Sequence, residues 1–365
     1  MSHPPSTTAT ASTASGGLLV IGSGAPADTP GAGLSTVRHD ATGAMSLLRT
    51  QPVDRPSYAA VDPTRPVLHA VVEERAGQIA SLRFDPRTGS LGLPTTVTSG
   101  GDGPCHLAVH PGGSHLFAAH YGDGVLSVIP VGPDAALAAE PVQTMSHPGR
   151  EASGGLHTTP HAHMAAPSPD GRFLLCPDLG TDRVHVYAFD PAAGRLSAHQ
   201  TVRLPDGCGP RHLVFHPSAG HVYVLNELSS TLTVGTWDAS TGHLEPTAEL
   251  ATRRDPDSPT ANQAGAVRVS PDGRFLYTTN RGDDAIAVHA LRAGGATVEL
   301  IDVTACGGSW PRDIALSSDG RLLFCANQRS DTLTAFHRDP ASGRLTPAGE
   351  PLVITEPTSV LPIGP

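Results

Sequence analysis

Short apolar runs separated by turn residues extend along the chain. The apolar run 275–279 follows the turn Pro271-Asp-Gly-Arg274, and the run 231–237 alternates polar and apolar residues. Runs of this kind, bounded by Gly, Pro and Asp, are typical of β-strands joined by tight turns. The pattern therefore predicts many short strands and no long helix.

The pattern repeats six times. Similar segments begin at residues 56, 104, 162, 210, 264 and 311, which gives intervals of 48, 58, 48, 54 and 47 residues. Pro104-Cys-His-Leu-Ala-Val-His-Pro111 and Pro210-Arg-His-Leu-Val-Phe-His-Pro217 show the match most clearly. Four short strands in a repeat of about 50 residues are the sequence signature of a propeller blade.

The two ends of the repeat region supply one further blade. Residues 18–24, 33–39 and 43–48 are predicted to be strands two, three and four of a blade, and 357–364 to be its first strand. Pairing these segments would close the ring and remove two exposed sheet edges. We expect an all-β, seven-bladed β-propeller with four-stranded antiparallel blades over 18–365, preceded by a disordered tail, 1–17.

Composition excludes several classes of function. Gly and Pro together number 75 (40 + 35), which excludes a helical bundle. The net charge of −10 argues against nucleic acid as a partner, and the sequence lacks an apolar stretch long enough to span a membrane. All 24 basic residues are arginine, so Schiff-base, pyridoxal-phosphate, P-loop and kinase chemistry are excluded. Five widely spaced cysteines predict neither a disulfide framework nor a structural zinc site, and we expect a cytoplasmic protein.

Polar residues recur where strand one of a blade starts and strand two ends, and both positions lie near the axis on one face. Arg211, Arg281, Arg312 and His163 occupy these positions, and their chemistry differs from repeat to repeat. Arginines gathered in an acidic protein predict a small anionic ligand. Glu227 is a candidate general base, and His163 a candidate acid or base. The alternative is that these arginines and Glu227 only pair with each other or with solvent.

Two other motifs have competing interpretations. His161 and His163 have strand spacing, as a metal pair would need, but no third ligand stands out, so neither a metal nor a cofactor is predicted. Cys105 is a candidate nucleophile, although a small buried cysteine is the commoner outcome. His110 and His216, each before a repeat proline, are interpreted as turn residues.

Several motifs together resemble the seven-bladed propeller lactonases. They are Pro160-His-Ala-His163, Ser168-Pro-Asp-Gly-Arg-Phe173, Gly209-Pro-Arg-His-Leu-Val-Phe-His-Pro217, Asn226-Glu227 and Asn280-Arg281. That family includes bacterial 6-phosphogluconolactonases of the cycloisomerase type and fungal carboxymuconate-lactonizing enzymes. The resemblance implies a site at one mouth of the channel, with the catalytic set of the carboxymuconate branch falling on His163, Arg211, Glu227 and Arg281.

The remaining mouth positions are predicted to bind substrate: Arg312, His106, His120, Tyr121, Asn226, Asn280 and Gln328. Family members often carry Ala-Asn-Tyr where this chain has Ala119-His120-Tyr121, and Asn-Pro-Ser where it has Arg55-Pro56-Ser57. These departures lie at the expected mouth, where substrate identity is decided.

Three functions fit these observations. The first is hydrolysis of a small anionic sugar-type lactone such as 6-phosphogluconolactone. The second is lactonizing cycloisomerisation of a carboxymuconate-like diacid or of an intermediate in specialised metabolism. The third is a non-catalytic propeller that serves as a binding scaffold.

Overall fold

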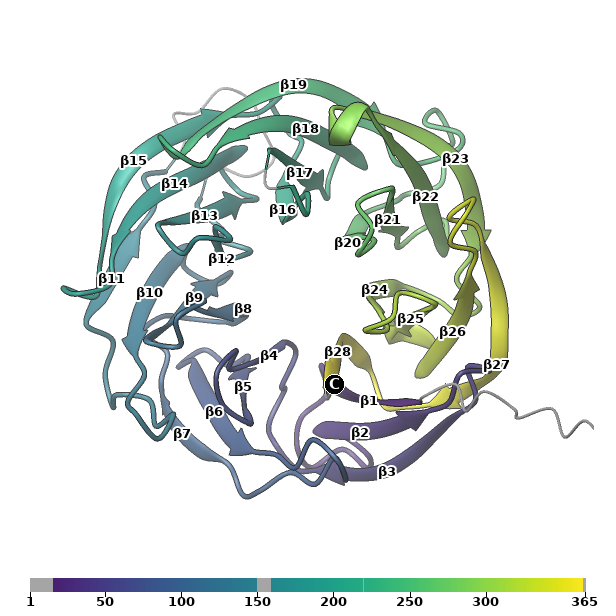
Figure 1. Ribbon diagram of the computed structural model, residues 1–365. Coiled ribbons are helices and arrows are strands. Elements are labelled where there is room, and N and C mark those ends of the chain that lie inside the picture. The colour runs from purple at the N-terminus through teal and green to yellow at the C-terminus, as the bar shows by residue number, and fades with distance from the viewer. Residues whose placement is uncertain (1–15, 150–158, 219, 364–365) are drawn as a thin grey trace, which may run out of the picture.

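The computed structural model of the protein describes residues 16–149, 159–218 and 220–363. In this part of the chain the strands form seven sheets of four antiparallel strands, arranged radially around a central axis (Figure 1). The predicted seven-bladed propeller is therefore confirmed. Nearly all of the predicted tail, 1–17, lies outside the described residues, and the first strand already begins at Gly17.

Each blade runs from an inner first strand to an outer fourth strand. Blades one to three comprise β4 (Ala59–Val61), β5 (Val67–Val72), β6 (Gln78–Arg83), β7 (Thr95–Thr98); β8 (Pro104–Val109), β9 (His115–His120), β10 (Val125–Pro130), β11 (Gln143–Ser146); and β12 (Ala166–Pro167), β13 (Phe173–Asp178), β14 (Arg183–Asp190), β15 (Arg195–Arg203).

Blades four to six follow in chain order, and two short 3-10 turns, η1 (Ala293–Gly295) and η2 (Gln328–Ser330), interrupt their loops. Their strands are β16 (Pro210–Phe215), β17 (His221–Asn226), β18 (Thr231–Asp238), β19 (His243–Ala251); β20 (Ala264–Val269), β21 (Phe275–Asn280), β22 (Ala285–Arg292), β23 (Thr297–Ala305); and β24 (Pro311–Leu316), β25 (Leu322–Asn327), β26 (Thr332–Arg338), β27 (Leu345–Val353).

Blade seven closes the ring. Its strand order is β28 (Pro357–Ile363), β1 (Gly17–Ser23), β2 (Leu34–His39) and β3 (Met45–Gln51), so its innermost strand comes from the C-terminal end. Leu18 pairs with Ile363 and Ile21 with Val360 in an antiparallel ladder. The closure expected from the leftover C-terminal segment is confirmed. Within the described residues, no helix is long and apolar enough to cross a membrane.

The hydrophobic core lies between neighbouring blades. Strand two of most blades is buried along its whole length, which explains why these strands are mostly apolar and carry their polar residues chiefly at the ends. One core cluster packs Phe173 and Val184 of blade three against Val222 and Trp237 of blade four. Each blade therefore buries its faces against its neighbours and keeps its loops free at the two ends of the channel.

Polar contacts between blades support this packing. Nε2 of His110 donates a hydrogen bond to the carbonyl oxygen of Gly171 at 3.1 Å, and Nε2 of His216 to that of Gly273 at 2.9 Å. Each of these histidines belongs to one blade, and its acceptor lies in the first turn of the next. The interpretation of His110 and His216 as turn residues is confirmed.

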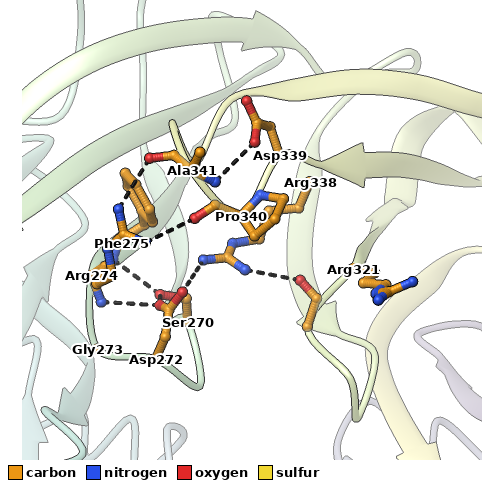
Figure 2. Close-up of polar contacts among 12 residues, drawn as sticks. Ser270, Asp272, Gly273, Arg274, Phe275, Arg321, Arg338, Asp339, Pro340 and Ala341 are labelled. Atoms are coloured by element: carbon orange, nitrogen blue, oxygen red, sulfur yellow. Dashed lines mark hydrogen bonds and ion pairs between the residues drawn. The ribbon is translucent and has the colours of Figure 1, made fainter.

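A buried arginine joins blades five and six at the end of the ring where these turns lie (Figure 2). Arg338 donates hydrogen bonds to Oδ2 of Asp272 at 2.8 Å, to the hydroxyl of Tyr277 at 2.9 Å and to the carbonyl oxygen of Gly320 at 3.1 Å. Arg274 reaches the carbonyl oxygens of Pro340 and Ala341 in blade six. Two of the donors of Arg338 thereby join blade six to blade five, and a third binds the turn of its own blade.

Candidate active site

Irregular pairing at the start of the innermost strands determines which side chains face the channel. Pro210 pairs with Asn226, but the next pair is His212 with Leu225, so Arg211 has no partner across the ladder. The same break leaves out Cys105 in blade two and Arg312 in blade six. A bulge of this kind bends the strand and redirects the side chain of the extra residue. Blades two, four and six therefore each have one residue without a ladder partner at the start of the innermost strand.

Glu227 connects two arginines from neighbouring blades. Its Oε2 lies 2.9 Å from Nε of Arg211 and 2.7 Å from Nη2 of Arg281. The backbone holds all three in place, since the amide of Glu227 donates to Gly209 at 2.7 Å and that of Arg281 to Gln263 at 2.8 Å. Arg211 also donates from Nη1 to the carbonyl oxygen of Gly265. Two of the predicted arginines and the predicted base therefore form one cluster.

The cluster is buried and carries an excess of positive charge. Exposed fractions are 3% for Arg211, 8% for Glu227 and 4% for Arg281. Burial and the nearby Arg281 lower the pKa of Arg211 to about 9, so its guanidinium stays protonated at neutral pH, and burial also lowers the pKa of Arg281. Two cations share one carboxylate in a poorly solvated site, where an added anion is bound far more strongly than in water.

His163 lies beside this cluster as a neutral imidazole. Burial, followed by the charges of Arg211 and Arg312, lowers the pKa of His163 well below its usual value. Its ring lies 5.6 Å from that of Tyr121 and 5.3 Å from that of His212, both edge to face. Desolvation and the neighbouring cations both oppose the protonated form of His163.

Three of the predicted binding residues surround the cluster. Nη1 of Arg312 lies 3.5 Å from Oε1 of Gln328, and the charge of Arg312 acts on Arg211, Arg281 and His163. Tyr121 is half-buried, and burial followed by the charge of Glu227 raises its pKa. The structure thus gathers Arg312, Gln328 and Tyr121 around the central ion pairs.

His106 lies in an aromatic group next to the cluster. Its ring is 4.2 Å from that of Tyr58 and 5.7 Å from that of His212. Burial and the charge of Arg268 lower its pKa to about 3, so the ring is neutral, and its Nε2 has no hydrogen-bond partner. His106 therefore connects with the cluster through His212.

The structure does not bring His120, Asn226 or Asn280 to the ligand side of the mouth. His120 contacts Ser99 Oγ and the carbonyl oxygen of Val125, each at 2.9 Å, and Asn280 is bonded to Thr252 of the preceding blade. Asn226 donates to the hydroxyls of Thr231 and Thr233. His120 and Asn226 are 0% exposed and Asn280 is 1% exposed. At the strand ends, these three side chains stabilise turns and contacts between blades.

Cys105 and the His161–His163 pair also have structural surroundings. The Cys105 thiol is buried against the carbonyl oxygen of His163, 3.4 Å away, and burial raises its pKa, which disfavours the thiolate. His161 stacks on Tyr121 with ring centroids 4.5 Å apart, and its Nδ1 lies 2.6 Å from the carbonyl oxygen of Tyr121. The ring of His161 is therefore occupied by its contacts with Tyr121, on a different side from His163.

One group of buried side chains has metal-ligand chemistry. His147, Asp178 and His185 bring their ligand atoms within 4.8 Å of one another. However, the rings of His147 and His185 are stacked, with centroids 4.0 Å apart at 29°. The nitrogen lone pairs of stacked rings lie in nearly parallel planes and do not converge on one ion at bonding distance. The contact of 2.5 Å between His147 and Asp178 instead resembles the contacts between blades made by His120 and Asn280.

A cleft of about 840 Å³ opens beside Arg281. Its wall includes Leu228 of blade four, Asn262 of blade five, and Trp310 and Arg329 of blade six. Sequence reasoning did not identify Trp310 or Arg329. A signal was available, because Trp310 stands directly before the repeat proline, where Gly103 and Gly209 stand in two other repeats.

A comparison with known families agrees with this architecture. The family model described as "Lactonase, 7-bladed beta-propeller" matches residues 19–362, nearly the whole chain. The chain belongs to the seven-bladed β-propeller lactonase family. The resemblance that the sequence motifs suggested is thereby confirmed.

Individual relatives of this propeller lactonase cover most of its length. It is 29% identical over 295 residues to a 6-phosphogluconolactonase of Bacillus subtilis, covering 80% of this chain and 82% of the relative. A protein of Staphylococcus saprophyticus is 33% identical over 283 residues, covering 76% and 80%. Among solved structures, the periplasmic gluconolactonase PpgL of Pseudomonas aeruginosa superposes with a TM-score of 0.89 at 30% identity, covering 96% of this chain and 99% of PpgL.

Proposed function

We propose that this propeller lactonase hydrolyses a small anionic sugar-type lactone, such as 6-phosphogluconolactone, at the mouth that holds Glu227. The observation that carries the proposal is the buried ion-pair cluster, in which Arg211 and Arg281 share one oxygen of Glu227. Family membership and the 6-phosphogluconolactonase and gluconolactonase relatives support the reaction class.

The arginines stabilise charge in the reaction. When a water oxygen attacks the lactone carbonyl carbon, the carbonyl oxygen becomes an oxyanion. Guanidinium groups fixed by the backbone and by Glu227 stabilise that oxyanion without having to reorganise. Arg211 is suited to this role because its guanidinium is held in one orientation, with Nε 2.9 Å from Oε2 of Glu227 and Nη1 donating to the carbonyl oxygen of Gly265.

Glu227 is the stronger candidate for the base. His163 is kept neutral by burial and by Arg211, and the same causes make it a poor proton acceptor. Both arginines contact Oε2 of Glu227, so Oε1 is the oxygen that we assign to an attacking water. Glu227 takes the proton of that water, the ring carbon–oxygen bond breaks, and the proton passes to the ring oxygen. The product is the open-chain hydroxy acid.

A pH-stat assay tests the proposal. We expect the wild type to accelerate the opening of 6-phosphogluconolactone above the buffer background, and Glu227→Gln to lower kcat/KM by roughly 100-fold or more. Glu74→Gln is the matched control, because Glu74 pairs with Arg55 after strand two of blade one and is far more exposed. Thermal melting of each variant confirms that it is folded at the assay temperature.

The outcomes separate the three functions. No acceleration on a panel of phosphorylated and plain aldonolactones would remove the hydrolase proposal. Loss of diene absorbance with carboxymuconate-like diacids would instead indicate a lactonizing cycloisomerase. Inactivity on both panels, together with a stoichiometric protein partner on affinity purification, would favour a binding scaffold.

A further inference from the structure

Trp310 occupies a strained backbone position at the mouth. Its φ is 65°, and the equivalent positions before strand one in blades two and four hold glycines, Gly103 with φ 59° and Gly209 with φ 61°. This left-handed conformation costs a residue with a side chain about 1–2 kcal/mol compared with glycine. The Trp310 amide donates to Oδ1 of Asp284 at 2.6 Å, which holds the residue in place. The fold therefore retains a large aromatic side chain where a glycine would be less strained.

The indole of Trp310 supports a second arginine. Cζ of Arg329 lies 3.3 Å from the Trp310 ring centroid, and Cζ of Arg281 lies 5.5 Å from it. Stacking fixes the plane of a guanidinium group while leaving its N–H donors free at the edge. Among the described residues, the Arg329 guanidinium forms no ion pair with a carboxylate, although the side chain is exposed. Trp310 thus orients an unneutralised cation before any ligand arrives.

Arg329 and Arg281 belong to one cleft. Both line the space of about 840 Å³ beside the ion-pair cluster, which is near the upper end of the range for small-molecule sites. A lactone ring alone would occupy only part of it. A ligand whose reacting carbonyl lies at the cluster therefore has room to extend past Arg281 toward Arg329.

We infer that Arg329, oriented by Trp310, binds a second anionic group of the substrate, remote from the lactone carbonyl, and so selects substrates that carry one. The group is a terminal oxyanion, either a phosphate monoester or a carboxylate, since a planar guanidinium binds both through paired N–H donors. This inference rests on the proposed function and specifies its substrate class.

Binding of the open-chain acids tests the inference without requiring turnover. Isothermal titration calorimetry compares gluconate, 6-phosphogluconate and glucarate, which differ at the carbon farthest from the first carboxylate. We expect the wild type to bind 6-phosphogluconate at least about tenfold tighter than gluconate, and Arg329→Gln to reduce this ratio to about twofold or less. Tighter binding of glucarate than of gluconate would show that a carboxylate suffices, whereas equal binding of the two would identify phosphate as the required group.

Two further variants sharpen the test. Arg321→Gln is the matched control, because Arg321 is an exposed arginine of the same blade, in the turn between its first two strands. It is expected to keep the wild-type ratio. Arg329→Lys retains the charge but not the planar stacking, and we expect an intermediate ratio.

Several results would overturn the inference. They are equal binding of 6-phosphogluconate and gluconate by the wild type, a wild-type ratio in Arg329→Gln, or an equal loss of affinity for all three acids. The failure of the proposed function is distinguishable from these. Selective anion binding that depends on Arg329, with no acceleration of lactone opening in the wild type, would remove the hydrolase but leave the anion site in place.

Discussion

Oε2 of Glu227 lies 2.7 Å from Nη2 of Arg281, and this ion pair joins the ends of the second strands of blades four and five. Because the same oxygen also contacts Arg211, the three groups act as one unit, which carries an excess of positive charge. We expect Glu227→Gln and Arg281→Gln each to lower kcat/KM by roughly 100-fold or more. The kcat/KM of the double variant should be only slightly lower than that of the less active single variant.

A double-mutant cycle measured by the lactone assay checks this coupling. The Arg172–Asp170 pair is the control, since it lies at a similar distance, 2.8 Å, in the turn between β12 and β13 at the other end of the ring, and is much more exposed. Its cycle should show small, additive effects. Additive losses at Glu227 and Arg281 would contradict the idea of a single charged unit.

Arg338 has a structural role in the contact shown in Figure 2. Arg338→Met would remove the charged donor to Asp272 and to the hydroxyl of Tyr277, although Asp272 is exposed and Tyr277 still donates to the carbonyl oxygen of Gly343. We expect a loss of about 1–3 kcal/mol in the free energy of unfolding, measured with urea, because the hydrogen bonds of a buried charged group are lost. The kcat below the melting transition should be unchanged, since Arg338 lies outside the site cluster; a large fall in kcat in the folded variant would contradict this assignment.

Buried histidines make the fold sensitive to acid. Burial lowers the pKa of His289 from 6.5 to about 4, and the pKa of His69 likewise to about 4. Between these values the unfolded chain binds a proton that the folded chain does not, so stability falls as pH drops from 6.5 toward 4.

For His289 the size of this effect is open to measurement. It amounts to about 1.4 kcal/mol per pH unit, or about 2 kcal/mol between pH 6.5 and 5. His289→Gln should reduce the pH dependence of the urea-unfolding free energy by that amount in this window. His243→Gln, at an exposed position, is the control and should leave it unchanged. An unaltered slope in His289→Gln would show that His289 titrates with the same pKa in the folded and unfolded states.

Cys105 is expected to be unreactive in the folded protein. Its thiol is buried and its pKa is raised by burial, so little thiolate is present at about pH 8. Iodoacetamide should leave native activity intact and modify all five cysteines only after denaturation in guanidinium, as mass spectrometry can count. Rapid inactivation that follows alkylation of Cys105 would contradict this expectation.

The strand pattern was predictable because each repeat encodes its own turns. Strands β8, β16, β20 and β24 begin at the residues where the aligned repeats begin. Blade three differs: β12 is reduced to Ala166–Pro167, and Ala162 forms only an isolated bridge with Asp178. Pro167 lacks a ladder donor, and the His161–His163 segment approaches Tyr121 instead, which the repeat alignment does not reveal.

The site was predictable only in part. His163, Arg211, Glu227 and Arg281 converge because equivalent repeat positions must lie side by side around a ring. The same positional rule also selected His120, Asn226 and Asn280. Their side chains, however, form hydrogen bonds with a turn of their own blade or with the preceding blade. The partner of such a side chain is often one blade away, and no local pattern indicates whether it faces that blade or the channel.

By itself, the order of residues determined the number of blades, the closure by the C-terminal strand and the register that brings distant repeats to one mouth, since all of these follow from periodic turns and apolar runs. The tertiary structure decided which of the predicted side chains gather in one cluster at the mouth. Bulges redirected Arg211 and Arg312, contacts between blades withdrew His120 and Asn280, and Trp310 oriented Arg329. These outcomes depend on hydrogen-bond geometry, burial and charge supplied by neighbouring blades, which no single repeat contains.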